Sequence, residues 1–193
     1  MLLRASPSKK SPKTGREALP PTVYKASSQK PLPERLCGLP PAITPNCRLL
    51  ILGSFPSAAS LVQRRYYAHP QNRFWPIVGA CLGVDLTQMA YRARIAAVNA
   101  AGIGIWDVYA SCERAGSLDS AIRHPAFNEF AQLRHRAPDL TRACFNGATA
   151  GKAVRHLQAL GFETCVLPST SPANASQSFD YKLALWRAAL RRP

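Results

Sequence analysis

The chain has 193 residues, with 25 Lys or Arg against 10 Asp or Glu, so its formal net charge is +15. Such a basic balance favours a polyanionic partner, either nucleic acid or an anionic membrane surface. No apolar run approaches the roughly 18 residues of a transmembrane helix, and the first thirty residues lack the apolar stretch of a signal peptide. We therefore expect a cytoplasmic, nucleoid-associated protein with no membrane partner.

The cysteines exclude two further classes of protein. All six are scattered, without a C-x-x-C pair or a histidine at ligand spacing, and several lie in apolar segments. A free cysteine in such a segment behaves as a small hydrophobic residue. We expect reduced thiols, no disulfide framework and no metal site, at Cys37, Cys47, Cys81, Cys112, Cys144 and Cys165.

The first part of the chain differs in composition from the rest. Residues 1–35 are rich in Pro, Ser and Lys, which predicts a disordered basic tail that cannot form a core. This tail could contact phosphates nonspecifically, or it could be a solvated segment without function. A folded domain is expected over residues 36–193, beginning with a proline-broken lead-in.

Strands and helices alternate in the predicted domain. Short apolar runs predict buried strands at 49–52, 103–108, 142–145 and 162–167. Helical spacing predicts helices at 74–82, 91–101, 127–136, 148–160 and 179–191, and a polar loop is expected over 111–125. This alternation predicts an α/β fold: a three-layer αβα sandwich around a central, mainly parallel four-stranded sheet.

Polar loops follow all four predicted strands, at Gly53–Pro56, Asp107–Val108, Asn146–Gly147 and Ser169–Asn174. Carboxyl ends of parallel strands meet at one edge of a sheet, so these loops should form a site. The glycine patterns of dinucleotide and P-loop sites are absent. Residues 66–75, YYAHPQNRFW, mix aromatic, amide and cationic side chains, which suits stacking on a base beside a phosphate chain. The sequence therefore favours cofactor-free chemistry on a nucleic acid.

The ordered blocks GSFPS, YYAHPQNRFW, GIGIWDVYASCERAGSLDS, FNG and LPSTSPAN resemble the uracil-DNA glycosylase superfamily. Within it, the chain is most similar to the hypoxanthine-DNA (DNA-deoxyinosine) glycosylase family. The resemblance implies a monofunctional enzyme that flips a deaminated base, above all hypoxanthine, out of DNA and hydrolyses its N-glycosidic bond. It also implies a monomer without metal or cofactor, acting on double-stranded and possibly single-stranded DNA. Iron–sulfur members need a cysteine cluster that this chain lacks.

The resemblance also implies roles for individual residues. Most superfamily members have Asp or Asn two positions after Gly53 to handle the attacking water, and here that position is Phe55. Asn72 is the expected substitute, while Asp107 could accept the N1–H of hypoxanthine or act as a base. The base-binding residues implied are Gly53, Ser54, Phe55, Tyr67, His69 and Asn146. The DNA-binding residues implied are Ser57, Arg64, Arg65, Arg73, Ser169, Ser171, Ala173 and Asn174.

Other interpretations remain open at this point. Asn72 could cap the helix at Phe74, Asp107 could be a structural acceptor, Phe55 could pack in the core, and Asn146 could form an Asn-Gly turn. Backbone N–H groups after Pro56 could stabilise the departing base. For the whole protein, the alternatives are a mismatch-specific uracil/thymine-DNA glycosylase of the same fold and a non-catalytic basic DNA-binding module.

Overall fold

The computed structural model describes residues 1–2 and 35–191. The described residues 35–191 belong to the unit Pro33–Pro193, and the site lies in this unit. Most of the predicted disordered tail, residues 3–34, lies outside the described residues.

The unit Pro33–Pro193 is built around a four-stranded sheet with the order β3-β2-β6-β7. Every neighbouring pair in this sheet is parallel, which confirms the four predicted strands and their arrangement. The strands are β2 (Leu49–Gly53), β3 (Ile103–Asp107), β6 (Arg142–Asn146) and β7 (Glu163–Leu167). All residues of β2 and β3 are buried, as their continuous apolar runs predicted.

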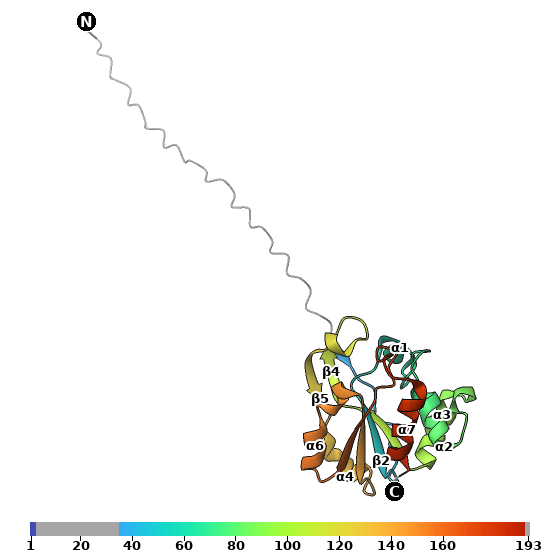
Figure 1. The fold of residues 1–193 in the computed structure, drawn as a ribbon. Coiled ribbons are helices and arrows are strands. Elements are labelled where there is room, and N and C mark those ends of the chain that lie inside the picture. The colour runs from blue at the N-terminus through green and yellow to red at the C-terminus, as the bar shows by residue number, and fades with distance from the viewer. Residues whose placement is uncertain (3–34, 192–193) are drawn as a thin grey trace. The chain divides into compact units, whose positions relative to one another are not determined.

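Helices lie on both sides of this sheet, which confirms the three-layer αβα sandwich (Figure 1). One side carries α2 (Phe74–Leu82), α3 (Tyr91–Ala100) and α7 (Phe179–Leu190), and the other side carries α4 (Leu133–Arg136) and α6 (Val154–Ala159). The shorter elements are α1 (Ala58–Gln63), α5 (Ala148–Gly151), η1 (Leu86–Gln88), η2 (Asp119–Ala121) and η3 (Phe130–Gln132). Among the described residues, no helix is long and apolar enough to cross a membrane.

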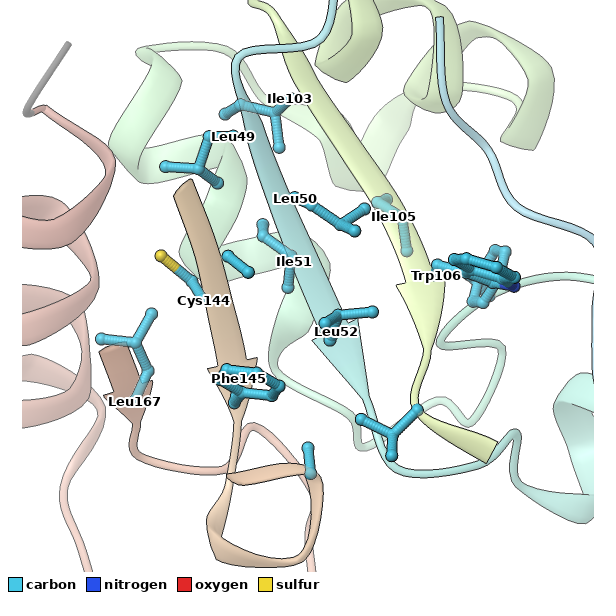
Figure 2. Close-up of a cluster of buried hydrophobic side chains, with 14 of the residues drawn as sticks. Leu49, Leu50, Ile51, Leu52, Ile103, Ile105, Trp106, Cys144, Phe145 and Leu167 are labelled. Carbon is cyan, nitrogen blue, oxygen red and sulfur yellow. The ribbon is translucent and has the colours of Figure 1, made fainter. Parts of the chain in front are cut away.

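The core follows the central strands. Figure 2 shows aliphatic and aromatic side chains of β2, β3, β6 and β7 packed along the sheet. Leu50, Ile51 and Phe145 are completely buried, and Trp186 of α7 closes the core with an indole that donates to Pro168 O. This packing fixes the carboxyl ends of the strands, where the polar loops begin.

Three predicted segments are wrong in detail. The expected polar loop over 111–125 contains most of β4 (Tyr109–Glu113) and the start of β5 (Arg123–Phe127), which form an antiparallel sheet with β1 (Arg35–Cys37). The expected helix over 127–136 is reduced to η3 and α4, because Phe127 belongs to β5. The expected helix over 148–160 is interrupted between α5 and α6.

The lead-in is also part of the fold. Besides β1, Ala42 forms an antiparallel bridge with Ile105, with two backbone hydrogen bonds of 2.9 and 3.0 Å. Prolines confine this segment to short pairings at a sheet edge, where a missing N–H is tolerated.

Candidate active site

A cavity of about 650 Å³ opens at the carboxyl edge of the parallel sheet. Each of the four strands contributes its last residue to the lining: Gly53, Asp107, Asn146 and Leu167. The loops that the sequence placed at one edge are thus brought together, as the strand-end rule requires.

Twelve of the predicted site residues line this cavity: Gly53, Ser54, Phe55, Ser57, Tyr67, Asn72, Asp107, Asn146, Ser169, Ser171, Ala173 and Asn174. The other four lie outside its lining. His69 and Arg65 line a separate cavity of about 440 Å³, and the His69 Nδ1 accepts from the Gln71 N–H at 3.2 Å. Arg64 ends α1 in an exposed position, and Arg73 is exposed with its guanidinium 5.9 Å from the Phe179 ring centroid.

Gly53 allows two functional side chains to approach the backbone. A Cβ added to this residue would collide with Asp107 Oδ1 and would lie 3.2 Å from the Tyr67 hydroxyl oxygen. Only glycine therefore leaves room for both oxygens at this point of the cavity wall.

Asp107 presents an unpaired carboxyl oxygen in a buried setting. Its side chain is buried, and its Oδ2 has no hydrogen-bond partner among the described residues. The backbone is fixed by Val108, whose N–H donates to Gly53 O, and by the Asn128 amide, which donates to Asp107 O. Burial, with a smaller contribution from the negative charge of Asp119, raises the pKa of Asp107 to about 7, although Arg114 opposes this shift. The carboxyl can thus exchange a proton near neutral pH.

Tyr67 lies next to this carboxyl. Its ring stacks on Phe74, with a centroid distance of 3.6 Å and an interplanar angle of 12°, and meets Trp75 edge-on. The hydroxyl is buried, and Asn146 lies close enough to lower its pKa, but no hydrogen bond of good geometry pairs it within the described part of the chain. Burial and then the negative charge of Asp107 raise the pKa of Tyr67, so the phenol stays protonated.

Two residues to which the sequence gave no role support the Gly53–Pro56 turn. Asp119 Oδ1 accepts a 2.7 Å hydrogen bond from Ser54 Oγ. Arg114 donates to Pro56 O, and its guanidinium carbon lies 5.0 Å from the centroid of the Phe55 ring. Phe55 is only 6% exposed, so it packs in the core and still lines the cavity. Both supporting residues fall in the ERAGSLDS part of the family-like block, which was the only sequence signal for them.

Asn72 has the capping contact that the structural alternative expected. Its Oδ1 accepts from the Phe74 N–H at 3.0 Å, which fixes the first turn of α2. The amide nitrogen has no hydrogen-bond partner among residues 35–191 and remains available to hold a water molecule. Structural and chemical roles are therefore compatible at this residue.

Asn146 fastens the loop that follows β7. Its Nδ2 donates to Thr170 Oγ1 and its Oδ1 accepts from the Thr170 N–H, both at 2.9 Å. The Arg73 N–H also donates to Thr170 O at 3.0 Å, so Thr170 links three site segments. Sequence reasoning missed this threonine because the pairing joins the end of β6 to the loop after β7, 24 positions further along the chain.

Two of the N–H groups after Pro56 are engaged within the protein, which limits their expected role in stabilising the base to the remaining ones. The Ala58 N–H donates to Ser117 Oγ and the Ser60 N–H donates to Ser57 Oγ. These contacts cap α1 from within and from the neighbouring loop, so that two of its first N–H groups are not free for a substrate.

Comparisons with known proteins agree with this geometry. A family model described as the Uracil DNA glycosylase superfamily matches residues 40–190. A hypoxanthine DNA glycosylase of Methanosarcina barkeri is 38% identical over 155 residues, which cover 80% of this chain and 98% of that protein. A hypoxanthine DNA glycosylase of Methanosarcina acetivorans is 40% identical over 154 residues, with coverages of 80% and 97%.

A solved structure is similar as well. The solution NMR structure of a candidate uracil DNA glycosylase from Methanosarcina acetivorans has a TM-score of 0.75 and 39% identity. The match covers 82% of this chain and 98% of that one. Similarity in sequence and in fold thus extends over almost the whole of these relatives.

Proposed function

Because the chain belongs to the uracil-DNA glycosylase superfamily, we propose that it is a monofunctional DNA glycosylase that removes hypoxanthine from DNA. The observation that carries this proposal is the unpaired, buried carboxyl oxygen of Asp107 beside aromatic rings in the cavity at the sheet edge. The two relatives named for this activity add support, since they match nearly over their full length.

The cavity offers the parts that base excision requires. The deaminated base, flipped out of the duplex, lies against the aromatic ring of Phe55, with Tyr67 beside its edge. Asp107, when ionised, accepts the N1–H of hypoxanthine or takes the proton of the attacking water. Asn72 holds that water through its free amide nitrogen, without supplying strong basicity.

The reaction is a hydrolysis. The bond between C1′ and the base nitrogen breaks first, its electron pair leaves with the base, and the sugar gains oxocarbenium character. Water then bonds to C1′ and loses a proton, and the base gains one, which leaves an abasic site and a free base. The loop Ser169–Asn174 at the cavity rim is positioned to contact the strand around the flipped nucleotide.

The test is alkali-dependent cleavage of duplexes that carry one hypoxanthine, uracil, xanthine or mismatched thymine. The wild-type protein should cut at hypoxanthine, and Asn72→Ala should lower the single-turnover rate by about 100-fold or more, as the loss of a water-positioning group does. Asn46→Ala is the matched control, because this exposed amide lies just before β2, at the opposite end of that strand from the site.

Each alternative outcome has a clear meaning. Cutting mainly at uracil or thymine mismatches would make the protein a mismatch-specific glycosylase of the same fold. Binding without any cutting would make it a non-catalytic DNA-binding module. If the Asn72→Ala variant remained active, we would assign the positioning of the attacking water to Asp107.

A further inference from the structure

The Asp107 carboxyl and the Tyr67 hydroxyl lie on one side of Gly53, and each group has a buried oxygen without a partner among the described residues. Asp107 Oδ1 and the Tyr67 hydroxyl both reach the position that a Gly53 Cβ would occupy, the hydroxyl at 3.2 Å from it. The hydroxyl and Asp107 Oδ2 have no hydrogen-bond partner among the described residues. Buried polar atoms in native proteins are nearly always paired, so a donor and an acceptor left unpaired on two side chains that line one cavity indicate a ligand.

The backbone at Tyr67 gives an independent observation. Its φ is +52°, a left-handed conformation that is rare for a bulky aromatic residue. Stacking on Phe74 and the edge contact with Trp75 hold the ring in place. Such strain persists where the surroundings over-determine it, and it concentrates at functional sites.

The neighbouring tyrosine provides a comparison within the same segment. The Tyr66 hydroxyl donates to Leu39 O or Pro40 O, at 3.2 and 3.0 Å, and its backbone is not in the left-handed region. Tyr66 is therefore satisfied by the protein itself, whereas Tyr67 combines an unusual backbone with an unsatisfied hydroxyl.

We propose that the Tyr67 hydroxyl is a catalytic group that donates a hydrogen bond to the ring carbonyl oxygen of the flipped base, while Asp107 accepts from the adjacent ring N–H. This inference rests on the proposed function. It assigns the pair to one chemical feature, the O=C–N–H edge that hypoxanthine, xanthine and uracil share.

The pair also explains how adenine and cytosine, the undamaged parents of hypoxanthine and uracil, are rejected, whereas guanine and thymine carry the same O=C–N–H edge and are not distinguished by it. Adenine and cytosine present an amino group and a bare ring nitrogen at the same two positions. A bare ring nitrogen opposite the Asp107 carboxylate places two acceptors against each other, which leaves both unpaired and costs binding energy. Deamination converts this edge into the complementary one.

The same contact contributes to the chemical step. As the glycosidic bond breaks, its electron pair spreads into the base, and negative charge collects on the carbonyl oxygen. A donor fixed at that oxygen binds the transition state more tightly than the ground state. The Ala58 and Ser60 N–H groups are occupied, and the unpaired Tyr67 hydroxyl is a donor in the cavity lining that can take their place.

The experiment compares Tyr67→Phe with the wild type on two duplexes, one carrying hypoxanthine and one carrying unsubstituted purine. Purine lacks both the carbonyl and the ring N–H of that edge. The variant should lose about 10- to 100-fold in single-turnover rate on hypoxanthine and change little on purine. Inhibition by the free bases gives the same comparison without turnover: the advantage of hypoxanthine over purine should shrink in the variant.

Tyr109→Phe serves as the matched control, since Tyr109 is buried on β4 and lies outside the cavity lining. An equal loss on both duplexes would show that the Tyr67 hydroxyl only supports the fold or Asp107, and would overturn the inference. An unchanged rate on hypoxanthine would overturn it as well, with the proposed function intact. A wild-type protein that cuts no duplex at all would instead overturn the proposed function.

Discussion

At the scale of single residues, the protonation of Asp107 connects the structure to a measurable pH profile. Its pKa is raised to about 7, first by burial and second by the charge of Asp119. Both roles open to Asp107, accepting a ring N–H and taking a proton from water, require the ionised form. We expect the single-turnover rate on hypoxanthine to rise with pH and to level off above about pH 7. Asp107→Asn should be slower by about 100-fold or more and should lack this step. A wild-type rate that is flat across the neutral range would contradict the assignment.

The same pKa makes a prediction about stability. In the unfolded chain the carboxyl titrates near 3.8, and in the fold it titrates near 7. Between these values the folded state keeps a proton that the unfolded state has released, so folding stability falls as pH rises from about 4 through 7. Asp107→Asn removes this titration, and we expect its free energy of unfolding to exceed that of the wild type by on the order of 3 kcal/mol at about pH 8. Thermal unfolding of both proteins from about pH 4 to about pH 8 measures this difference, which should shrink toward zero at the acid end. A difference that is constant with pH would show that the carboxyl is not held in its neutral form by the fold.

At the scale of elements, the loop after β7 is fastened to α7 by a buried lysine. Lys182 is only 2% exposed, and its ammonium donates to Ser169 O at 2.8 Å and to Asn174 O at 2.5 Å. These two carbonyls stand at the two ends of the loop that is proposed to grip DNA, so one cation fixes its path. Hydrogen bonds from a charged donor contribute about 1.5–3 kcal/mol each.

We therefore expect Lys182→Met to raise the KM for a hypoxanthine duplex about tenfold or more, with a smaller change in kcat. The methionine keeps a flexible, unbranched side chain one atom shorter and removes the ammonium with its donors and its charge. Lys152→Met is the control, because it removes the same charge from an exposed position after α5 whose side chain has no hydrogen bond to this loop among the described residues. Steady-state kinetics of the two variants separates loop positioning from charge, and equal KM values for both would refute the role of Lys182.

The elements also show what the sequence could predict. The central strands were found because each is a continuous apolar run buried by helices on both faces, as Leu49–Gly53 illustrates. β4 and β5 were missed because they are partly exposed, mix polar with apolar residues, and pair with register shifts. In the site, the strand-end rule found Gly53, Asp107 and Asn146, whose positions follow from topology alone. It could not find Asp119 or Arg114, since their contacts with Ser54 and Pro56 span 65 and 58 positions of sequence.

At the scale of the whole molecule, charge governs the encounter with DNA more than the site does. The net charge is +15, and the first thirty residues hold seven Lys or Arg against one Glu. The cavity itself contains Asp107 and Asp119. We therefore expect attraction to phosphates to come from cations outside the lining, and the candidates are Arg64, Arg65, Arg73 and the N-terminal residues.

Because these cations lie outside the cavity, we expect DNA binding and catalysis to respond differently to salt. Neutralising a DNA phosphate releases counterions, so the logarithm of the affinity for undamaged duplex DNA should fall linearly with the logarithm of salt concentration. The test uses the full chain with the seven N-terminal cations replaced by glutamine. Its affinity for DNA should drop, and the slope should become shallower by about 0.9 for each phosphate that is no longer neutralised. The single-turnover rate at saturating enzyme should stay the same. Fluorescence anisotropy between about 50 and about 300 mM salt measures the slope. Tyr67→Phe is the matched control, because it alters the base site without changing the charge. An unchanged slope would mean that the folded unit alone neutralises the phosphates. If the N-terminal cations contacted DNA, replacing them would reduce the number of counterions released and change the slope.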